Sequence, residues 1–253
     1  MTDIVAIGGF GSTPKQYDTL AEKLHDKFGP DLAISGVNFF TAVNDPESLA
    51  DKIHQRRVIT HSAGAYAVAK AVAIGATPAR LDMIAPPTYD QSLRLMVNGI
   101  RYDRRQKRLK QNLPLEEAPE REASQILRHP RTHLGAVAVL GKFQTLNFAT
   151  SCVQLDVPTR VGLMDQDGLF RIGRYPREEL EYALETGVGV RLLSGDHTRF
   201  TREPSQALDE LDRARNIELE DYSRFGSSEL SAIEIGRAAA ALSGLLLPIR
   251  RGV

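Results

Sequence analysis

The hydrophobic pattern of the chain consists of short, unbroken apolar runs separated by longer stretches with helical periodicity. The apolar runs are typical of strands covered on both faces, and they fall at residues 4–7, 32–37, 58–60, 81–85, 157–164 and 188–193. Helical patterns begin at Pro14, at Asp45-Pro46, after Ser62, at Pro176 and at Glu203-Pro204. Strands that alternate with helices predict an α/β fold, with a mostly parallel sheet and helices on both of its faces.

The alternation is interrupted in the middle of the chain. Pro86-Pro87 ends the fourth predicted strand, because proline cannot join a central ladder. Residues 88–149 then hold two helix-like stretches, at 89–111 and 119–127, and a mixed apolar segment at 134–148. We therefore predict a core formed by residues 1–87 and 150–253, which ends in an amphipathic helix at 227–247, and a helical insertion at 88–149.

Composition and charge narrow the class of protein. The chain has 253 residues, of which 42% are hydrophobic and 25% charged, as expected for one large globular α/β domain. Lys+Arg and Asp+Glu both number 32, so the net charge favours neither nucleic acid nor an anionic membrane as a partner. No segment predicts a signal peptide or a membrane span, and the single Cys152, expected to be a packed residue, allows no intramolecular disulfide. We expect a cytoplasmic protein.

Ser62 is the candidate nucleophile. It lies on a turn of small residues between an apolar strand and a helix. Such a turn pushes the hydroxyl out of the fold, and the following amides and the helix N-terminus face any negative charge that develops beside it. The alternative interpretation is that Ser62 is only the N-cap of the helix.

Other polar residues follow the ends of later strands. Asp165 and Asp167 follow the fifth strand, and His197 follows the sixth. The carboxyl ends of parallel strands meet at one edge of the sheet, so these side chains are expected near Ser62. An imidazole with a pKa near 6.5 takes a proton from serine near neutrality, and a carboxylate orients the imidazole. His197 is therefore the predicted base, and either aspartate can be its partner.

The turn at Thr60-His61-Ser62-Ala63-Gly64 resembles the nucleophile elbow of the alpha/beta-hydrolase family, G-x-S-x-G, with Thr60 in place of the first glycine. The order serine, aspartate, histidine along the chain is also that of the family. Gly8-Gly9-Phe10-Gly11 resembles the family's His-Gly loop, with glycine in place of histidine. The resemblance covers residues 3–87 and 150–212 and implies a fold that lacks the family's first two strands.

The resemblance implies a catalytic triad of Ser62, Asp165 and His197. Asp165 is preferred because Gly162-Leu163-Met164-Asp165 is similar to the family's G-x-x-D, and Asp167 is the alternative acid. The backbone N–H groups of Phe10 and Ala63 would form an oxyanion hole. The insertion lies where the family carries its cap. The implied activity is hydrolysis of a small-molecule carboxylic ester or thioester through an acyl-Ser62 intermediate, without a cofactor or a metal.

Several alternatives stay open at this point. The same triad serves carbon-carbon bond hydrolysis or perhydrolysis, and a non-catalytic ligand-binding module can keep the fold. The basic run at 101–110 is either a solvated helix face or a rim that attracts anionic substrates. The sequence is compatible with a monomer or a homodimer. The expected cap residues of the pocket are Leu93, Met96 and Val97.

Three other sequence features are not expected to take part in chemistry. His61 flanks the serine, but neighbouring side chains diverge, so a packing role is expected for it. His129 and His133 have a spacing that suggests a metal, but Pro130 lies between them and no acidic or cysteine cluster completes the site. The glycines from Gly8 onward lack the register of a dinucleotide-binding loop.

Overall fold

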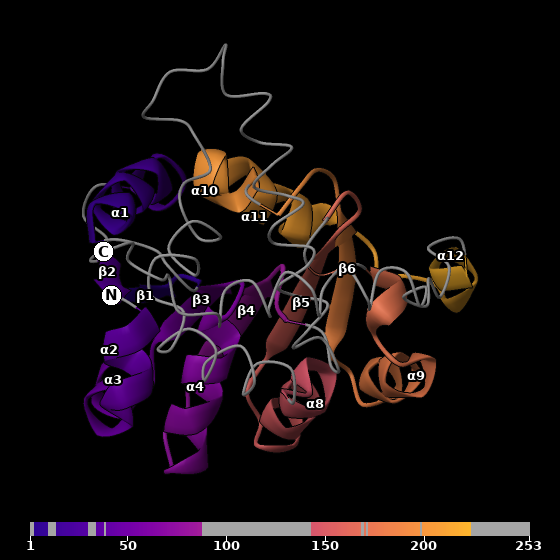
Figure 1. Ribbon diagram of the computed structural model, residues 1–253, viewed down its shortest axis with the longest axis horizontal. Helices are drawn as coiled ribbons and strands as arrows, with labels where there is room; N and C mark the ends of the chain where they lie inside the picture. Colours follow the sequence, from indigo (N-terminus) through magenta and orange to yellow (C-terminus); the bar gives the residue numbers. More distant parts are fainter. Residues whose placement is uncertain are drawn as a thin grey trace, which may run out of the picture.

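The central feature of the fold is a six-stranded parallel sheet with the strand order β2-β1-β3-β4-β5-β6 (Figure 1). The computed structural model describes residues 3–9, 14–29, 34–37, 39–87, 143–167, 170, 172–197 and 199–223. The strands are β1 (Ile4–Ile7), β2 (Ile34–Val37), β3 (Arg57–His61), β4 (Arg80–Ile84), β5 (Thr159–Met164) and β6 (Gly189–Leu193). Every neighbouring pair is parallel, which confirms the predicted fold class.

Helices cover both faces of this sheet. On one face lie α1 (Pro14–Phe28), α10 (Arg199–Arg202) and α11 (Pro204–Arg213), which are seen above the sheet in Figure 1. The other face is covered by α2 (Phe39–Asn44), α3 (Pro46–Ile53), α4 (Gly64–Ala73), α8 (Thr145–Gln154) and α9 (Arg177–Glu185). A 3-10 turn, η2 (Ile172–Arg174), and the short α12 (Leu219–Ser223) complete the described elements. None of the described helices is long and apolar enough to cross a membrane.

The alternation of side chains along the strands produces one apolar cluster on each face. The larger cluster, under α4, α8 and α9, includes Val5, Val58, Leu81, Met83, Leu146, Val161, Leu180 and Val190. The smaller cluster, under α1, α10 and α11, includes Ile4, Leu24, Ile59, Ile84, Met164, Leu193, Phe200 and Leu208. Both faces are buried, which is why the strands appear in the sequence as continuous apolar runs.

The structure adds four short helices that the hydrophobic pattern did not predict. These are α2, α8, α10 and α12. Helix α8 begins at Thr145 without a side-chain cap, and only its first four residues fall within the mixed apolar segment predicted at 134–148. It packs on β5 and α9. The helical stretches predicted at 89–111, 119–127 and 227–247 lie outside the described residues, as do Leu93, Met96, Val97 and the basic run at 101–110, and the division of the chain at 88–149 stays a prediction.

A fully buried carboxylate, that of Asp82 on β4, lies on the α1–α11 face among three arginines, one from its own strand and one from each neighbouring strand. Its Oδ2 accepts from Nη2 of Arg57 at 2.6 Å. Its Oδ1 accepts from Nε of Arg160 at 2.7 Å and from Nε of Arg80 at 3.2 Å. Burial raises the pKa of this carboxyl, but the three guanidinium groups outweigh the burial and hold the pKa below its usual range. One buried carboxylate thus pairs with three cations near the amino ends of β3, β4 and β5, and Asp212 of α11 pairs with two of them, Arg80 and Arg160.

We expect Asp82→Asn to lower the free energy of unfolding by about 3–5 kcal/mol, because it removes the carboxylate that three partly buried cations share. The measurement is urea unfolding at neutral pH. The matched control is Glu181→Gln, which breaks an exposed pair with Arg177 at 2.8 Å and should cost less than about 1 kcal/mol. Equal costs for the two variants would contradict this role of Asp82.

Candidate active site

Ser62 lies between the end of β3 and the start of α4 in a backbone conformation that few serines adopt. Its φ is 55°, in the left-handed region that costs a residue with a Cβ about 1–2 kcal/mol. The Ser62 amide donates to the carbonyl of Ile84 at 2.9 Å, so the hydrogen bonds between β3 and β4 continue as far as Ser62. The backbone thus passes from β3 into α4 through a left-handed residue at Ser62.

Gly64 explains how the turn fits against the first strand. A Cβ at this position would lie 2.4 Å from the carbonyl oxygen of Ile7 and 2.9 Å from that of Gly8, and both are backbone atoms. Only glycine allows this approach, which brings the start of α4 against the end of β1. The loop after β1 therefore leaves the sheet beside Ser62.

Thr60, which replaces the first glycine of the family's elbow, belongs to the strand and not to the turn. It is paired with Ile7 on one side and Met83 on the other, and it is fully buried. Its Oγ1 has no hydrogen-bond partner among the described residues. The branched side chain is accommodated in the sheet, and the turn begins only after His61.

His197 connects the serine to a carboxylate. Its Nε2 lies 3.0 Å from Oγ of Ser62, and its Nδ1 lies 2.8 Å from Oδ2 of Asp167. The three residues are 1%, 3% and 5% exposed, so little water competes for these contacts. An ionised carboxylate only accepts hydrogen bonds, so Nδ1 carries the proton and the lone pair of Nε2 faces the serine. This is the tautomer that a general base for Ser62 requires.

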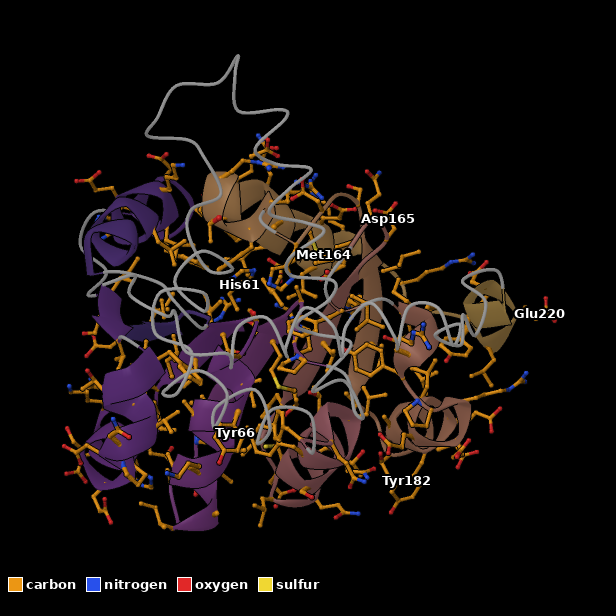
Figure 2. All side chains as sticks on the ribbon, in the orientation of Figure 1. His61, Tyr66, Met164, Asp165, Tyr182 and Glu220 are labelled. Atoms are coloured by element: carbon orange, nitrogen blue, oxygen red, sulfur yellow. The ribbon has the colours of Figure 1, made fainter. Side chains whose placement is uncertain are left out.

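The structure corrects the preferred partner of the histidine from Asp165 to Asp167. Asp165 is exposed, and its Oδ1 accepts from the amide of Gly195 at 2.7 Å. In Figure 2 it lies at the outer rim near the ends of β5 and β6. Its own amide extends the β5–β6 ladder by donating to the Leu193 carbonyl. The chain then bends, because the Asp167 amide donates to Met164 at 3.2 Å, and Asp167 is directed inward.

Phe170 holds the second oxygen of Asp167, a contact that has no signature in the sequence. The Phe170 amide donates to Oδ1 of Asp167 at 2.8 Å, which leaves Oδ2 for the imidazole. The Phe170 ring meets the His197 ring edge-on, with 5.1 Å between centroids. One residue thus orients the carboxylate with its backbone and shields the imidazole with its side chain.

Polar contacts on the outer side fix the loop that carries His197. Glu210 of α11 accepts from the Ser194 amide at 2.8 Å and also pairs with Arg199. Asp196 pairs with Arg202 at 3.2 Å. Together with the contact from Asp165 to this loop, these bonds hold the residues immediately before the histidine. The partners lie after β5, on α10 and on α11, so neither motif nor spacing identifies them.

The predicted oxyanion hole is described in part. Ala63 is buried at the N-cap position of α4, directly after Ser62, so its amide lies at the positive end of a ten-residue helix. No hydrogen bond from this amide is present among the described residues. Phe10 lies outside them, and its role as the second donor stays a prediction.

His61 is buried next to the site, and the pKa of its imidazole is lowered. Its Nε2 donates to the backbone carbonyl of His197 at 2.8 Å. Burial, followed by the neighbouring His197, lowers the pKa of His61 from 6.5 to about 3, although the bond to the carbonyl and the charge of Asp167 oppose the shift. The uncharged ring of Phe200 in α10 packs on the His61 ring. His61 in the folded protein is therefore neutral near neutral pH.

This pKa predicts acid destabilisation. Unfolded His61 binds a proton below pH 6.5, whereas folded His61 does so only near pH 3, so between these values the unfolded state holds more protons. We expect His61 to lower the free energy of unfolding by up to about 1.4 kcal/mol per pH unit as the pH falls from 6.5 towards 3. Urea unfolding of the wild type and of His61→Gln at pH 4, 5, 6 and 7 tests this. The same dependence of the free energy of unfolding on pH in both proteins would contradict this prediction.

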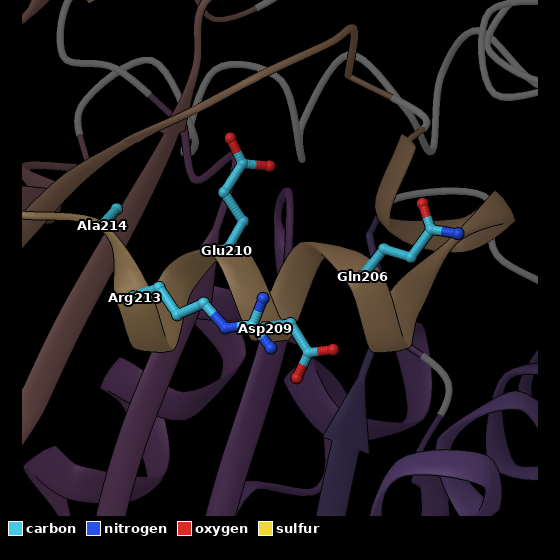
Figure 3. Close-up of a pocket in the computed structure, with 5 residues that line it drawn as sticks. All are labelled: Gln206, Asp209, Glu210, Arg213 and Ala214. Atoms are coloured by element: carbon cyan, nitrogen blue, oxygen red, sulfur yellow. The ribbon is translucent and has the colours of Figure 1, made fainter.

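Among the described residues, we also considered a surface depression on α11 and the side chains that could bind a metal ion, and neither forms a second candidate site. A surface depression of about 520 Å³ along α11 is lined by Gln206, Asp209, Glu210, Arg213 and Ala214 (Figure 3). It contains no serine, cysteine or histidine. In the part of the chain that the structure describes, no group of histidine, cysteine, aspartate and glutamate is arranged to hold a metal ion.

Comparison with known proteins identifies the fold. No protein-family model matches the sequence, and no curated protein matches it. Among solved structures, a bromoperoxidase from Bacillus anthracis is similar to 84% of this chain over 92% of its own length, with a TM-score of 0.53 and 13% identity. An alpha/beta hydrolase enzyme from a Medee basin deep-sea metagenome library covers 91% of both chains, with a TM-score of 0.51 and 15% identity. This likeness and the six-stranded parallel sheet show that the chain has the alpha/beta-hydrolase fold.

Proposed function

We propose that this protein is a serine hydrolase that cleaves a carboxylic ester or thioester through an acyl-Ser62 intermediate. The observation that carries the proposal is the unbroken contact from Ser62 Oγ through the His197 ring to Asp167, at 3.0 Å and 2.8 Å. These contacts are buried, and they join three strand ends that lie far apart in the sequence. A packing role would require neither the left-handed serine nor the tautomer that Asp167 imposes.

The first half of the reaction forms the acyl-enzyme. As Oγ of Ser62 attacks the carbonyl carbon, Nε2 of His197 takes its proton, and Asp167 stabilises the resulting imidazolium. The carbonyl oxygen becomes an oxyanion and accepts hydrogen bonds from the Ala63 amide and, as predicted from the sequence, from Phe10. The imidazolium then gives its proton to the leaving alcohol or thiol as the carbon–oxygen or carbon–sulfur bond breaks.

The second half releases the acid. Nε2 of His197 takes a proton from water, and the hydroxide oxygen attacks the acyl carbon. The tetrahedral intermediate collapses, the bond to Oγ breaks, and the proton on His197 returns to Ser62. All proton transfers pass through one imidazole, so no cofactor or metal is needed for the reaction.

Turnover of a panel of substrates tests this proposal. The panel contains p-nitrophenyl esters of two to twelve carbons and matching thioesters, with peracid formation from acetate and hydrogen peroxide as the perhydrolase alternative. Saturable hydrolysis of at least one ester or thioester is expected. Covalent labelling of Ser62 without turnover of any member would instead favour a ligand-binding module.

A further inference from the structure

His61 makes a contact that joins the serine strand to the histidine loop without involving the reacting atoms. It is the last residue of β3 and the neighbour of Ser62. Its Nε2 lies 2.8 Å from the backbone carbonyl of His197. A carbonyl oxygen only accepts, so the proton of the neutral His61 ring is on Nε2. One end of this contact thus moves with Ser62 and the other with His197.

The ring of His61 also packs against the imidazole of His197. The two ring centroids are 4.9 Å apart, with an angle of 41° between the planes. The His61 ring centroid also lies 5.6 Å from that of Phe200. Figure 2 shows His61 in the interior, between the sheet and helices α10 and α11. The His61 side chain thus contacts both the ring and the backbone carbonyl of His197.

Other contacts of the loop join it to different elements of the fold. Asp165, directly after β5, accepts from the Gly195 amide, and Glu210 of α11 accepts from the Ser194 amide. The bond of His61 connects the same loop to the end of β3.

We propose that His61 is a positioning residue, which sets the distance between His197 Nε2 and Ser62 Oγ by anchoring the His197 backbone to the end of β3. The inference rests on the proposed hydrolase function. A neutral donor suits this place, because a second cation 4.9 Å away would oppose the imidazolium that forms on His197. Loss of the donor lets the loop shift, and a misplacement of about 1 Å costs up to about 100-fold in rate.

Three substitutions of His61 separate positioning from packing. His61→Leu fills similar space without a donor. His61→Gln restores a donor near the place of Nε2, whereas His61→Asn places its donor near that of Nδ1, too short to reach the carbonyl. For the best substrate of the ester panel, we expect His61→Leu to lower kcat about 10–100-fold with KM changed less than about threefold. His61→Gln should recover most of the loss, and His61→Asn should not.

Rates are expressed per folded protein, with the folded fraction measured by circular dichroism at the assay temperature. A merely structural role would lower only the folded fraction and would leave kcat per folded molecule unchanged in all three variants. That result, or equal rescue by His61→Asn and His61→Gln, would overturn the role of His61. A well-folded wild type that neither hydrolyses the panel nor reacts with a fluorophosphonate would contradict the hydrolase function itself.

Discussion

Ser62→Ala should reduce kcat for the best ester about 10⁵–10⁶-fold while the fold stays intact. The hydroxyl is the group that forms the covalent intermediate, and loss of a nucleophile of this kind removes nearly all catalysis by the triad. Alanine keeps the Cβ, so it meets the same backbone strain at φ 55° as serine does. Steady-state turnover, together with a thermal melt within a few degrees of the wild type, measures both expectations.

Ser151→Ala is the matched control for this substitution. Ser151 lies exposed on α8, where its hydroxyl donates to the Asn147 carbonyl, and it has no contact with the candidate site. Its loss should leave kcat within about twofold of the wild type, as expected for a surface change. Undiminished turnover in Ser62→Ala would contradict the assignment of Ser62 as the nucleophile.

Asp167→Asn should reduce kcat about 10⁴-fold, the second largest effect. The amide of asparagine can donate to Nδ1 of His197, which moves the imidazole proton to Nε2 and removes the lone pair that faces Ser62. Asp165→Asn keeps an oxygen that accepts from Gly195, so it should cost less than about tenfold. Parallel kinetics of the two variants on one ester, with KM determined for each, measure the difference.

The pair of aspartate variants also discriminates between the two assignments of the acid. A large loss in Asp167→Asn alone agrees with the geometry at His197. A large loss in Asp165→Asn with little change in Asp167→Asn would show that the carboxylate at the rim, and not the buried one, supports the histidine.

The architecture was predictable because the sheet is buried on both faces. Strands such as β3 and β4 therefore appear as unbroken apolar runs, and their ends mark where polar residues converge. Short helices such as α10 carry no such signal, since a single turn has no period to detect. Helix α8 was missed because it lacks a capping side chain and its apolar face is mixed with polar residues.

The sequence predicts which strand ends carry the site residues, but not which side chains at those ends contact one another. Spacing brings both aspartates to the end of β5, yet the choice between them depends on the turn bond from Asp167 to Met164 and on the Phe170 amide. Neither bond has a sequence signature. His61 was expected only to pack because its side chain diverges from that of Ser62. It does diverge, but it reaches the backbone of a residue 136 positions away.

Covalent labelling by a fluorophosphonate tests the central claim most directly, because it requires an activated serine and no knowledge of the substrate. Mass spectrometry of the intact protein should show one adduct per chain, and peptide mapping should locate it at Ser62. Labelling should disappear in Ser62→Ala and become much slower in Asp167→Asn, while Ser151→Ala labels at the wild-type rate. An adduct on another residue, or ester turnover by a chain that accepts no label at Ser62, would contradict the account.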